Sequence, residues 1–189
     1  MFGITALPLY ICRIKQPGMK KIIVLMAVVI CTSSILMAQR DSKFRLSVGP
    51  ELSFASGSFS ETHSIGIGGS AQAEISLQEH LYGTATFGLI SYNGKSSGAG
   101  YKYKGETILP LRVGVKYFLS GGIYGAAQLG VGFLNNGGGT AFAYSPQIGY
   151  EFKTKSDKAL DATFKYDGYS GKGNIGTLGA IGFRVGYIF

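Results

Sequence analysis

The sequence predicts an all-β fold, an eight-stranded antiparallel up-and-down transmembrane β-barrel, from three observations. Apolar and polar or small residues alternate with a period of two along eight stretches, and helical periodicity is almost absent. One parity is free of charge in every stretch, whereas the other carries charges of both signs. Short and long connections follow one another along the chain. These features favour a closed sheet with one apolar and one polar face.

The breaks between the alternating stretches are rich in glycine, which favours turns. In chain order, we expect strands at residues 44–56, 64–77, 81–91, 105–119, 123–133, 140–152, 159–168 and 176–189. The residues that define the apolar parity are, strand by strand, Phe44, Leu46, Val48, Leu52 and Phe54; Ile65, Ile67, Ala71, Ala73 and Ile75; Leu81, Ala85, Phe87 and Leu89; Leu109, Leu111, Val113, Val115 and Tyr117; Ile123, Ala127, Leu129, Val131 and Phe133; Phe142, Tyr144, Ile148, Tyr150 and Phe152; Leu160, Ala162, Phe164 and Tyr166; and Ile181, Phe183, Val185, Tyr187 and Phe189.

Alternation alone leaves the direction of the apolar face open, because a soluble lipocalin-type barrel has the same period with its apolar set inside. Volume favours the opposite arrangement. An eight-stranded barrel encloses roughly the room that its own side chains need, so a set this rich in Phe and Tyr would require a large ligand cavity. The other parity is small or polar and fills a narrow lumen. We therefore expect the apolar face to point outward, toward lipid.

Ten charged residues lie on the inward parity, five of each sign, which favours structural ion pairs between the walls. A narrow conduction path is the alternative, although a wide water-filled pore needs more strands. The ten are Arg45, Arg112, Lys116, Lys165 and Arg184 with Glu51, Glu74, Glu151, Asp161 and Asp167.

The connections indicate how the barrel is oriented, since outer-membrane barrels have short turns at one end and longer loops at the other. From a periplasmic amino terminus, the inner turns fall at 78–80, 120–122 and 153–158, and the outer loops at 57–63, 92–104, 134–139 and 169–175. An even number of strands returns the carboxy terminus to the periplasm.

Three prolines conflict with this scheme. Pro50, Pro110 and Pro146 each fall within an expected strand, and a closed barrel has no edge where a missing N–H is harmless. We expect bulges or strand starts at these positions.

Residues 1–38 predict an upstream extension plus a secretory signal peptide, and residues 39–189 the barrel domain. Lys20 and Lys21 precede a short apolar run at residues 22–30, and Ala38 marks the expected cleavage region. Four of the 18 basic residues lie in this segment, so the net charge falls from +8 to +4, or 14 basic against 10 acidic residues. No basic cluster remains to bind nucleic acid. Both cysteines, Cys12 and Cys31, also lie in the leader, which excludes disulfides from the barrel domain.

Few motifs suggest chemistry, and we expect no catalytic residue, cofactor or metal. Gly171, Gly173 and Gly176 match a dinucleotide-binding pattern, but a strand follows them where that site needs a helix. His63 and His80 fall at opposite ends of the barrel and cannot share a metal. His63 lies near serine and glutamate residues, as a lipid hydrolase would require, yet such neighbours in a loop are usually solvated polar groups.

Four segments resemble the small outer-membrane β-barrel proteins of Gram-negative bacteria, broadly similar to the OmpA and OmpX barrels. They are FRLSVGPELSF at residues 44–54, ILPLRVGVKYFL at 108–119, FAYSPQIGYEF at 142–152 and GFRVGYIF at 182–189. The resemblance implies an outer-membrane location after signal-peptide export, and Tyr187 and Phe189 resemble the signal that such proteins present to the barrel-assembly machinery. Aromatic residues suit the headgroup boundary, here the inner rim residues Tyr117, Tyr150, Phe152, Tyr187 and Phe189.

The expected function is that of a monomeric integral outer-membrane protein with a filled lumen, in contact with outer-membrane lipid and lipopolysaccharide. Fold-level analogy favours a structural or adhesive role rather than that of a general porin. The alternatives are a lipid-modifying enzyme of the outer membrane, a narrow channel and a soluble periplasmic lipocalin-like ligand carrier.

Overall fold

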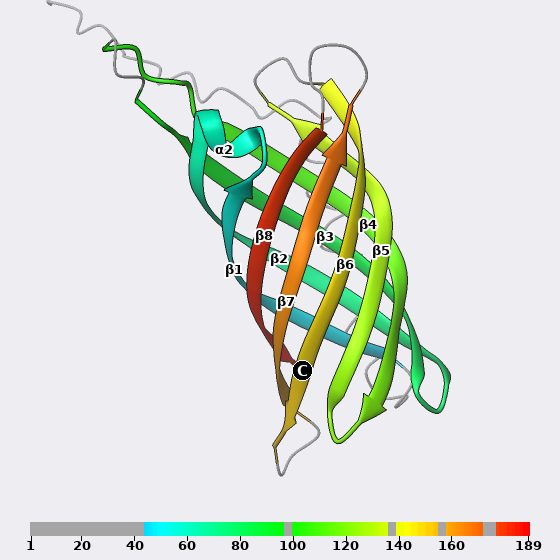
Figure 1. Ribbon diagram of the computed structural model, residues 1–189. Coiled ribbons are helices and arrows are strands. Elements are labelled where there is room, and N and C mark those ends of the chain that lie inside the picture. The colour runs from blue at the N-terminus through cyan, green and yellow to red at the C-terminus, as the bar shows by residue number, and fades with distance from the viewer. Residues whose placement is uncertain (1–43, 97–99, 136–138, 155–157, 172–176) are drawn as a thin grey trace, which may run out of the picture. The chain divides into compact units, whose positions relative to one another are not determined.

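The computed structural model describes residues 44–96, 100–135, 139–154, 158–171 and 177–189 (Figure 1). They form a closed barrel in which every strand pairs antiparallel with its sequence neighbours, and β8 pairs with β1. The expected leader, residues 1–38, lies outside the described residues.

The sequence prediction of eight strands is confirmed, with ends that differ by a few residues. The strands are β1 (Phe44–Ser56), β2 (His63–Gln78), β3 (Leu81–Gly94), β4 (Glu106–Ser120), β5 (Ile123–Leu134), β6 (Gly139–Lys153), β7 (Ala159–Ser170) and β8 (Thr177–Ile188). Tight turns join β2 to β3 and β4 to β5, and the carboxy terminus lies at the same end of the barrel (Figure 1). We call this end the turn end and the opposite one the loop end.

One element of the loop end is not predicted by the sequence. The expected loop between β1 and β2 contains a helical turn, α2 (Phe59–Thr62). Phe59 is only 3% exposed, and its ring lies 5.0 Å from that of Tyr92 in an edge-to-face contact. The burial of this aromatic ring fixes the turn, which is too short to be visible as helical periodicity.

The apolar parity faces outward, as the volume of the side chains predicts. Ile67, Val113 and Leu119 are 63%, 62% and 63% exposed on the outer wall. Glu74 and Arg184, on the opposite parity, are 2% and 4% exposed. The barrel is therefore polar inside and apolar outside, the inverse of a lipocalin. Within the described residues, no helix is long and apolar enough to cross a bilayer.

The expectation of bulges or strand starts at the three prolines is wrong. On one side of each proline the strand pairing is continuous, because Pro50 lies opposite Gly69 and Pro110 opposite Gly132. On the other side, two residue pairs are missing. The β1–β8 pairs pass from Val48–Tyr187 to Glu51–Arg184 with no change of register.

The same interruption occurs at the other two prolines. The β3–β4 pairs pass from Phe87–Leu111 to Ile90–Ile108, and the β6–β7 pairs from Tyr144–Gly168 to Gln147–Lys165. Each proline thus faces, on one side only, a short gap in the ladder, as expected for a residue that has no N–H to donate. The barrel closes without an edge and without a bulge at these positions.

Candidate functional site: the filled lumen and its two ends

Five charged side chains form a cluster in the turn-end half of the lumen. Lys116 Nζ lies 2.9 Å from both Glu74 and Asp161 and 3.6 Å from Glu151. Arg45 pairs with Glu74 and, at 2.8 Å, with Glu151. These five residues, the turn-end cluster, join β1, β2, β4, β6 and β7, and their two positive and three negative charges sum to −1.

Aromatic rings pack against the cations of the turn-end cluster. The Arg45 guanidinium lies 4.6 Å from the centroid of the Tyr82 ring, and Lys116 Nζ lies 4.0 Å from that of Tyr124. The Tyr124 hydroxyl donates a hydrogen bond to Asp161 at 2.5 Å. Each cation thus has carboxylates and the face of a ring within reach, which compensates for its withdrawal from water.

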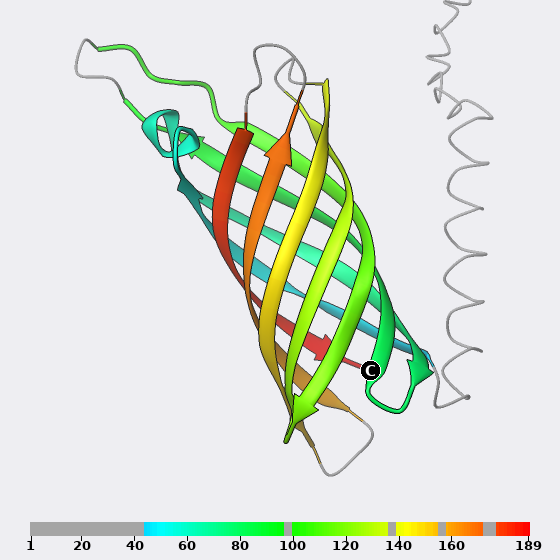
Figure 2. The same ribbon diagram turned by 45° about the vertical axis from the view of Figure 1, so that its right-hand side comes forward.

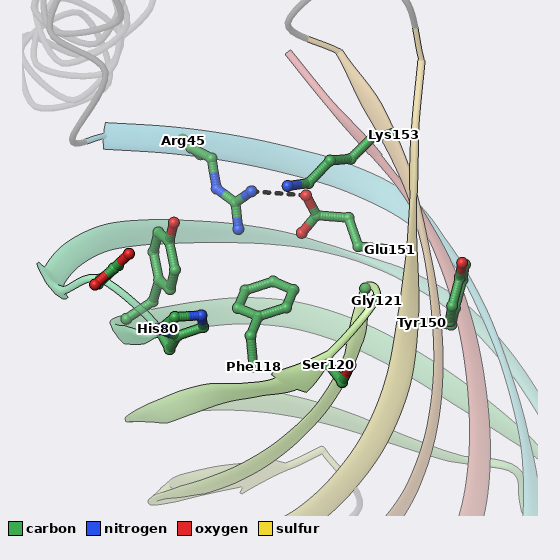
Figure 3. Close-up of a pocket in the computed structure, with 11 residues that line it drawn as sticks. Arg45, His80, Phe118, Ser120, Gly121, Tyr150, Glu151 and Lys153 are labelled. Atoms are coloured by element: carbon green, nitrogen blue, oxygen red, sulfur yellow. Dashed lines mark hydrogen bonds and ion pairs between the residues drawn. The ribbon is translucent and has the colours of Figure 1, made fainter.

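A pocket of about 630 Å³ lies at the mouth of the turn end. Figure 3 shows the Arg45–Glu151 pair among the residues that line it, with Phe118 between His80 and Ser120. Arg45 is the most accessible member of the turn-end cluster, with 20% of its side chain exposed. The turn-end cluster therefore meets solvent through this pocket.

Neutral polar side chains separate the turn-end cluster from the rest of the lumen. Gln128 donates hydrogen bonds to Thr84 at 3.1 Å and to Thr86 at 2.9 Å, and Thr86 donates to Gln72 at 3.0 Å. Gln72 in turn donates to Glu74 at 2.8 Å. The Gln128 hydrogen bonds of this layer link β5 to β3, which is not its neighbour in the sheet.

The other five charges form a second cluster nearer the loop end. Lys165 Nζ lies 2.7 Å from Glu51 and 3.0 Å from Asp167, and Asp167 pairs with Arg112. Arg184 Nε lies 3.8 Å from Glu51. These residues, the loop-end cluster, carry three positive and two negative charges, a sum of +1. The two clusters together are neutral, as the sequence count of five of each sign requires.

Apolar side chains lie across the loop end of the lumen, above the loop-end cluster. Ile90 and Ile108 are fully buried, and Tyr92 and Tyr169 are 1% exposed. We call this group the apolar plug; its members are Phe59, Ile90, Tyr92, Ile108, Leu134, Ala141, Ala143, Tyr169 and Ala180. The Tyr92 hydroxyl and Ser53, 2.8 Å apart, connect it to the polar lumen below. The plug separates the charged lumen from the loop end.

All ten inward charges predicted from the sequence lie in the lumen, but the lumen also contains bulky residues that were not predicted there. Tyr82, Ile90, Ile108, Phe118 and Tyr124 share the inward parity with small and polar neighbours. They lie toward the two ends of the barrel, where the lumen is capped. The alternation of faces, continued to the last residue of each strand, assigns these five side chains to the inward face.

The two histidines lie at opposite ends of the barrel. His63 Nδ1 is 2.8 Å from the Thr62 hydroxyl, and its Nε2 donates to the carbonyl of Lys104 at 3.2 Å. The nearby serines bond elsewhere, Ser60 to the carbonyl of Gly57 and Ser64 to that of Asn93. His80 lines the turn-end pocket. Of the dinucleotide-type glycines, Gly173 and Gly176 lie outside the described residues.

Exposed aromatic side chains surround the turn end on the outer wall. Ring pairs form between Tyr150 and Phe152, with centroids 4.5 Å apart, and between Tyr187 and Phe189, 5.0 Å apart. Tyr117 is 53% exposed. Toward the loop end, Phe54, Phe133 and Phe142 are exposed as well. The apolar wall thus has aromatic rings at both of its borders.

No protein-family model matches the sequence, and no curated protein matches it. Solved structures are similar in fold. Ail, the attachment invasion locus protein of Yersinia pestis, has a TM-score of 0.52 and 14% identity, with 78% of this chain and 98% of Ail covered. Neisserial surface protein A has a TM-score of 0.56 and 13% identity, with 77% of this chain and 95% of that protein covered.

The chain has the fold of the eight-stranded outer-membrane barrels. A backbone structure of Ail in a phospholipid bilayer nanodisc matches with a TM-score of 0.52 at 14% identity, covering 78% of this chain and 99% of Ail. Another structure shows Ail in complex with the heparin analogue sucrose octasulfate, with a TM-score of 0.51.

Proposed function

We propose that this chain is an integral protein of a bacterial outer membrane, with a barrel filled by its own side chains and a structural or adhesive role at the cell surface. The observation that carries the proposal is the distribution of polarity across the wall. Residues such as Ile67 and Val113 are more than half exposed, while Lys116 and Asp161 are buried inside. Only a surrounding of lipid stabilises both faces at once.

The alternatives fit this wall less well. A soluble ligand carrier would present polar residues to water, whereas this outer wall would form an apolar patch far larger than the few hundred Å² that soluble monomers expose. A general porin needs an open lumen, and here ion pairs bridge the walls and the apolar plug crosses one end. We infer that the barrel acts through its surface and not through conduction or catalysis.

The proposed orientation places the turn end in the periplasm and the loop end outside the cell. Residues 1–38 would direct export and be removed, and Tyr187 and Phe189 would present the carboxy-terminal signal to the barrel-assembly machinery. Tyr117, Tyr150 and Phe152 would then lie at the inner headgroup boundary, where amphipathic rings are favoured. The protein would be a monomer in contact with outer-membrane lipid and lipopolysaccharide.

Cell fractionation tests the proposal directly. The full chain, expressed in a Gram-negative host, is expected in the outer-membrane fraction, to resist extraction by alkaline carbonate and to migrate faster on SDS gels when unheated than when boiled. Recovery in the aqueous periplasmic fraction without detergent would contradict it.

The role of the lumen needs a separate measurement. In planar bilayers the purified barrel is expected to give no steady conductance, and Ile108→Gly, which thins the apolar plug, is the variant most suited to open a path. Steady conductance of the unaltered protein would favour the narrow channel. Changed lipid A acylation on expression of the protein would favour the lipid-modifying enzyme.

A further inference from the structure

The connection between β3 and β4 continues as a two-stranded arm beyond the end of the barrel. Ser96 and Lys102 form an antiparallel bridge, and the Tyr103 N–H donates to the carbonyl of Lys95 at 2.9 Å. A Cβ on Gly94 would lie 1.9 Å from the Tyr103 carbonyl oxygen, so the two segments approach closely. We call residues 94–96 and 100–105 the β3–β4 arm. It projects past α2 in both views (Figures 1 and 2).

Helix α2 holds the base of the β3–β4 arm. The Lys95 N–H donates to the carbonyl of Thr62 at 2.8 Å, and Lys95 Nζ donates to the carbonyl of Ser60 at 2.5 Å. On the other segment, the Lys104 carbonyl accepts from His63 Nε2. The base of the arm is therefore ordered before any partner arrives, which lowers the entropic cost of binding.

The segment of the arm that leads into β4 alternates tyrosine and lysine at residues 101–104. Tyr101 and Tyr103 are 64% and 37% exposed, and their rings meet edge to face with centroids 5.5 Å apart. Lys102 and Lys104 are exposed between and beside them. The sequence from 94 to 105 contains three lysines and no acidic residue. An exposed pair of rings within a cationic segment is a surface for an anionic partner that also has apolar faces.

The lysines of the arm lie beyond the apolar band of the outer wall. Leu109 is the last apolar residue on the outward parity of β4, which begins at Glu106. Lys104 and Lys102 lie five and seven residues beyond Leu109, outside the barrel strand. We therefore expect them to face the medium and not the acyl chains.

We propose that the β3–β4 arm binds an acidic polysaccharide outside the cell, with Lys102 and Lys104 paired to its sulfate or carboxylate groups and Tyr101 and Tyr103 packed on its sugar rings. The C–H edges of a pyranose carry partial positive charge and suit the negative face of a tyrosine ring. Lysines are depleted in protein–protein interfaces, which favours a polyanionic glycan over a folded protein partner. The inference rests on the proposed surface location, and it names the partner class of the adhesive role.

Titration of the purified, detergent-solubilised full chain with dextran sulfate, and with neutral dextran as the matched probe, tests the inference. We expect saturable binding of dextran sulfate that weakens with added salt, and no binding of dextran. Lys102→Gln with Lys104→Gln is expected to raise the Kd about tenfold, since two charge-assisted contacts are lost. Lys153→Gln with Lys158→Gln removes the same charge at the turn end and should leave the Kd unchanged.

Substitutions of the two tyrosines distinguish specific packing on sugar rings from nonspecific electrostatic attraction. Tyr101→Ala with Tyr103→Ala should raise the Kd severalfold, and Phe at both positions should restore it, because the ring face is retained. The unheated band on SDS gels confirms that each variant is folded. Equal weakening by the arm and turn-end lysine variants, or an unchanged Kd in the tyrosine-to-alanine variant, would overturn the inference.

The source of the anion is tested with vesicles that contain lipopolysaccharide. The variant with Lys102→Gln and Lys104→Gln should bind these vesicles as strongly as the unaltered protein does. The assignment to a polysaccharide would be overturned if this variant lost vesicle binding and the unaltered protein did not bind dextran sulfate. Binding in detergent does not depend on where the protein resides in the cell, so failure here and failure of the fractionation experiment remain distinguishable.

Discussion

Arg112 on β4 and Asp167 on β7 form an ion pair across the lumen between strands that are not neighbours, and neither side chain is more than 1% exposed. Asp167 also accepts a hydrogen bond from Ser145 at 2.7 Å and lies 3.0 Å from Lys165. Such a pair adds stability only while both partners are present, because each charge alone is costly to keep out of water. Ion pairs in the lumen therefore connect opposite walls of the barrel. Each charge of such a pair is stabilised only while its partner is present.

Removing one charge of this pair should destabilise the barrel strongly. We expect Asp167→Asn to lower the free energy of unfolding by about 3–5 kcal/mol, since Arg112 is left buried without its main partner. The double variant Arg112→Met with Asp167→Leu should cost less than the sum of the two single changes. Urea unfolding in lipid vesicles measures both. Glu79→Gln, on an exposed turn, serves as the control and should change stability by less than about 0.5 kcal/mol.

Lys116 should be more sensitive to substitution than Arg45, although both are cations of the turn-end cluster. Lys116 lies within 4 Å of three carboxylates and is fully buried, whereas Arg45 keeps 20% of its side chain exposed at the pocket. Lys116→Met leaves three buried carboxylates with a single cation. We expect it to destabilise the barrel by several times the effect of Arg45→Met in the same unfolding measurement. Equal effects would mean that water enters the cluster freely.

Two glycines on adjacent strands should respond in opposite ways to a methyl group. A Cβ on Gly114 would lie 2.0 Å from the carbonyl oxygen of Ala127, whereas one on Gly125 meets nothing within 4 Å. Gly114→Ala must move the backbone of β4 or β5 and should prevent folding or cost several kcal/mol. Gly125→Ala should be neutral or stabilising by up to about 1 kcal/mol, because alanine restricts the unfolded chain. The shift between heated and unheated gel bands reports on folding of both.

The wall of the barrel could be predicted from the sequence because its rule is local. In a strand, the side chain of Val113 points to the face opposite that of Arg112, whatever the rest of the chain does. That rule, with the volume of the side chains, is sufficient for the strand number, the closure and the direction of each face. The alternation rule does not predict the helical turn at Phe59, because a turn this short leaves no periodic pattern.

The arrangement inside the lumen could not be predicted in the same way. Arg45 pairs with Glu151, which is 106 positions away, and this contact depends on the stagger of all strands between them. Parity shows that the charges point inward but not at which height each one lies. The separation into a turn-end and a loop-end cluster is therefore a property of the register between strands, which the alternation within each strand does not specify.

Position should decide whether the wall accepts a proline. Pro110 faces β3 where two residue pairs are missing, so Pro110→Ala adds an N–H without breaking any bond. We expect it to change the free energy of unfolding by less than about 1 kcal/mol. Val113→Pro, three residues along the same strand, lies where both neighbours pair with β4 and should abolish folding. Normal folding of Val113→Pro would contradict the pairing of Val113 with both neighbouring strands.

Depth along the outer wall gives the sharpest test of a membrane environment. Val113 and Leu119 lie on the same face of β4 with nearly equal exposure, 62% and 63%, but Val113 is near the middle of the apolar wall and Leu119 near its turn-end border. In lipid, Val113→Arg should cost about 2–4 kcal/mol and Leu119→Arg at most about 1 kcal/mol, because an arginine near the border reaches the headgroups. In water, the two substitutions should be equally tolerated. Unfolding measured in vesicles separates the two cases, and equal costs at both depths would show that the apolar wall does not span a bilayer.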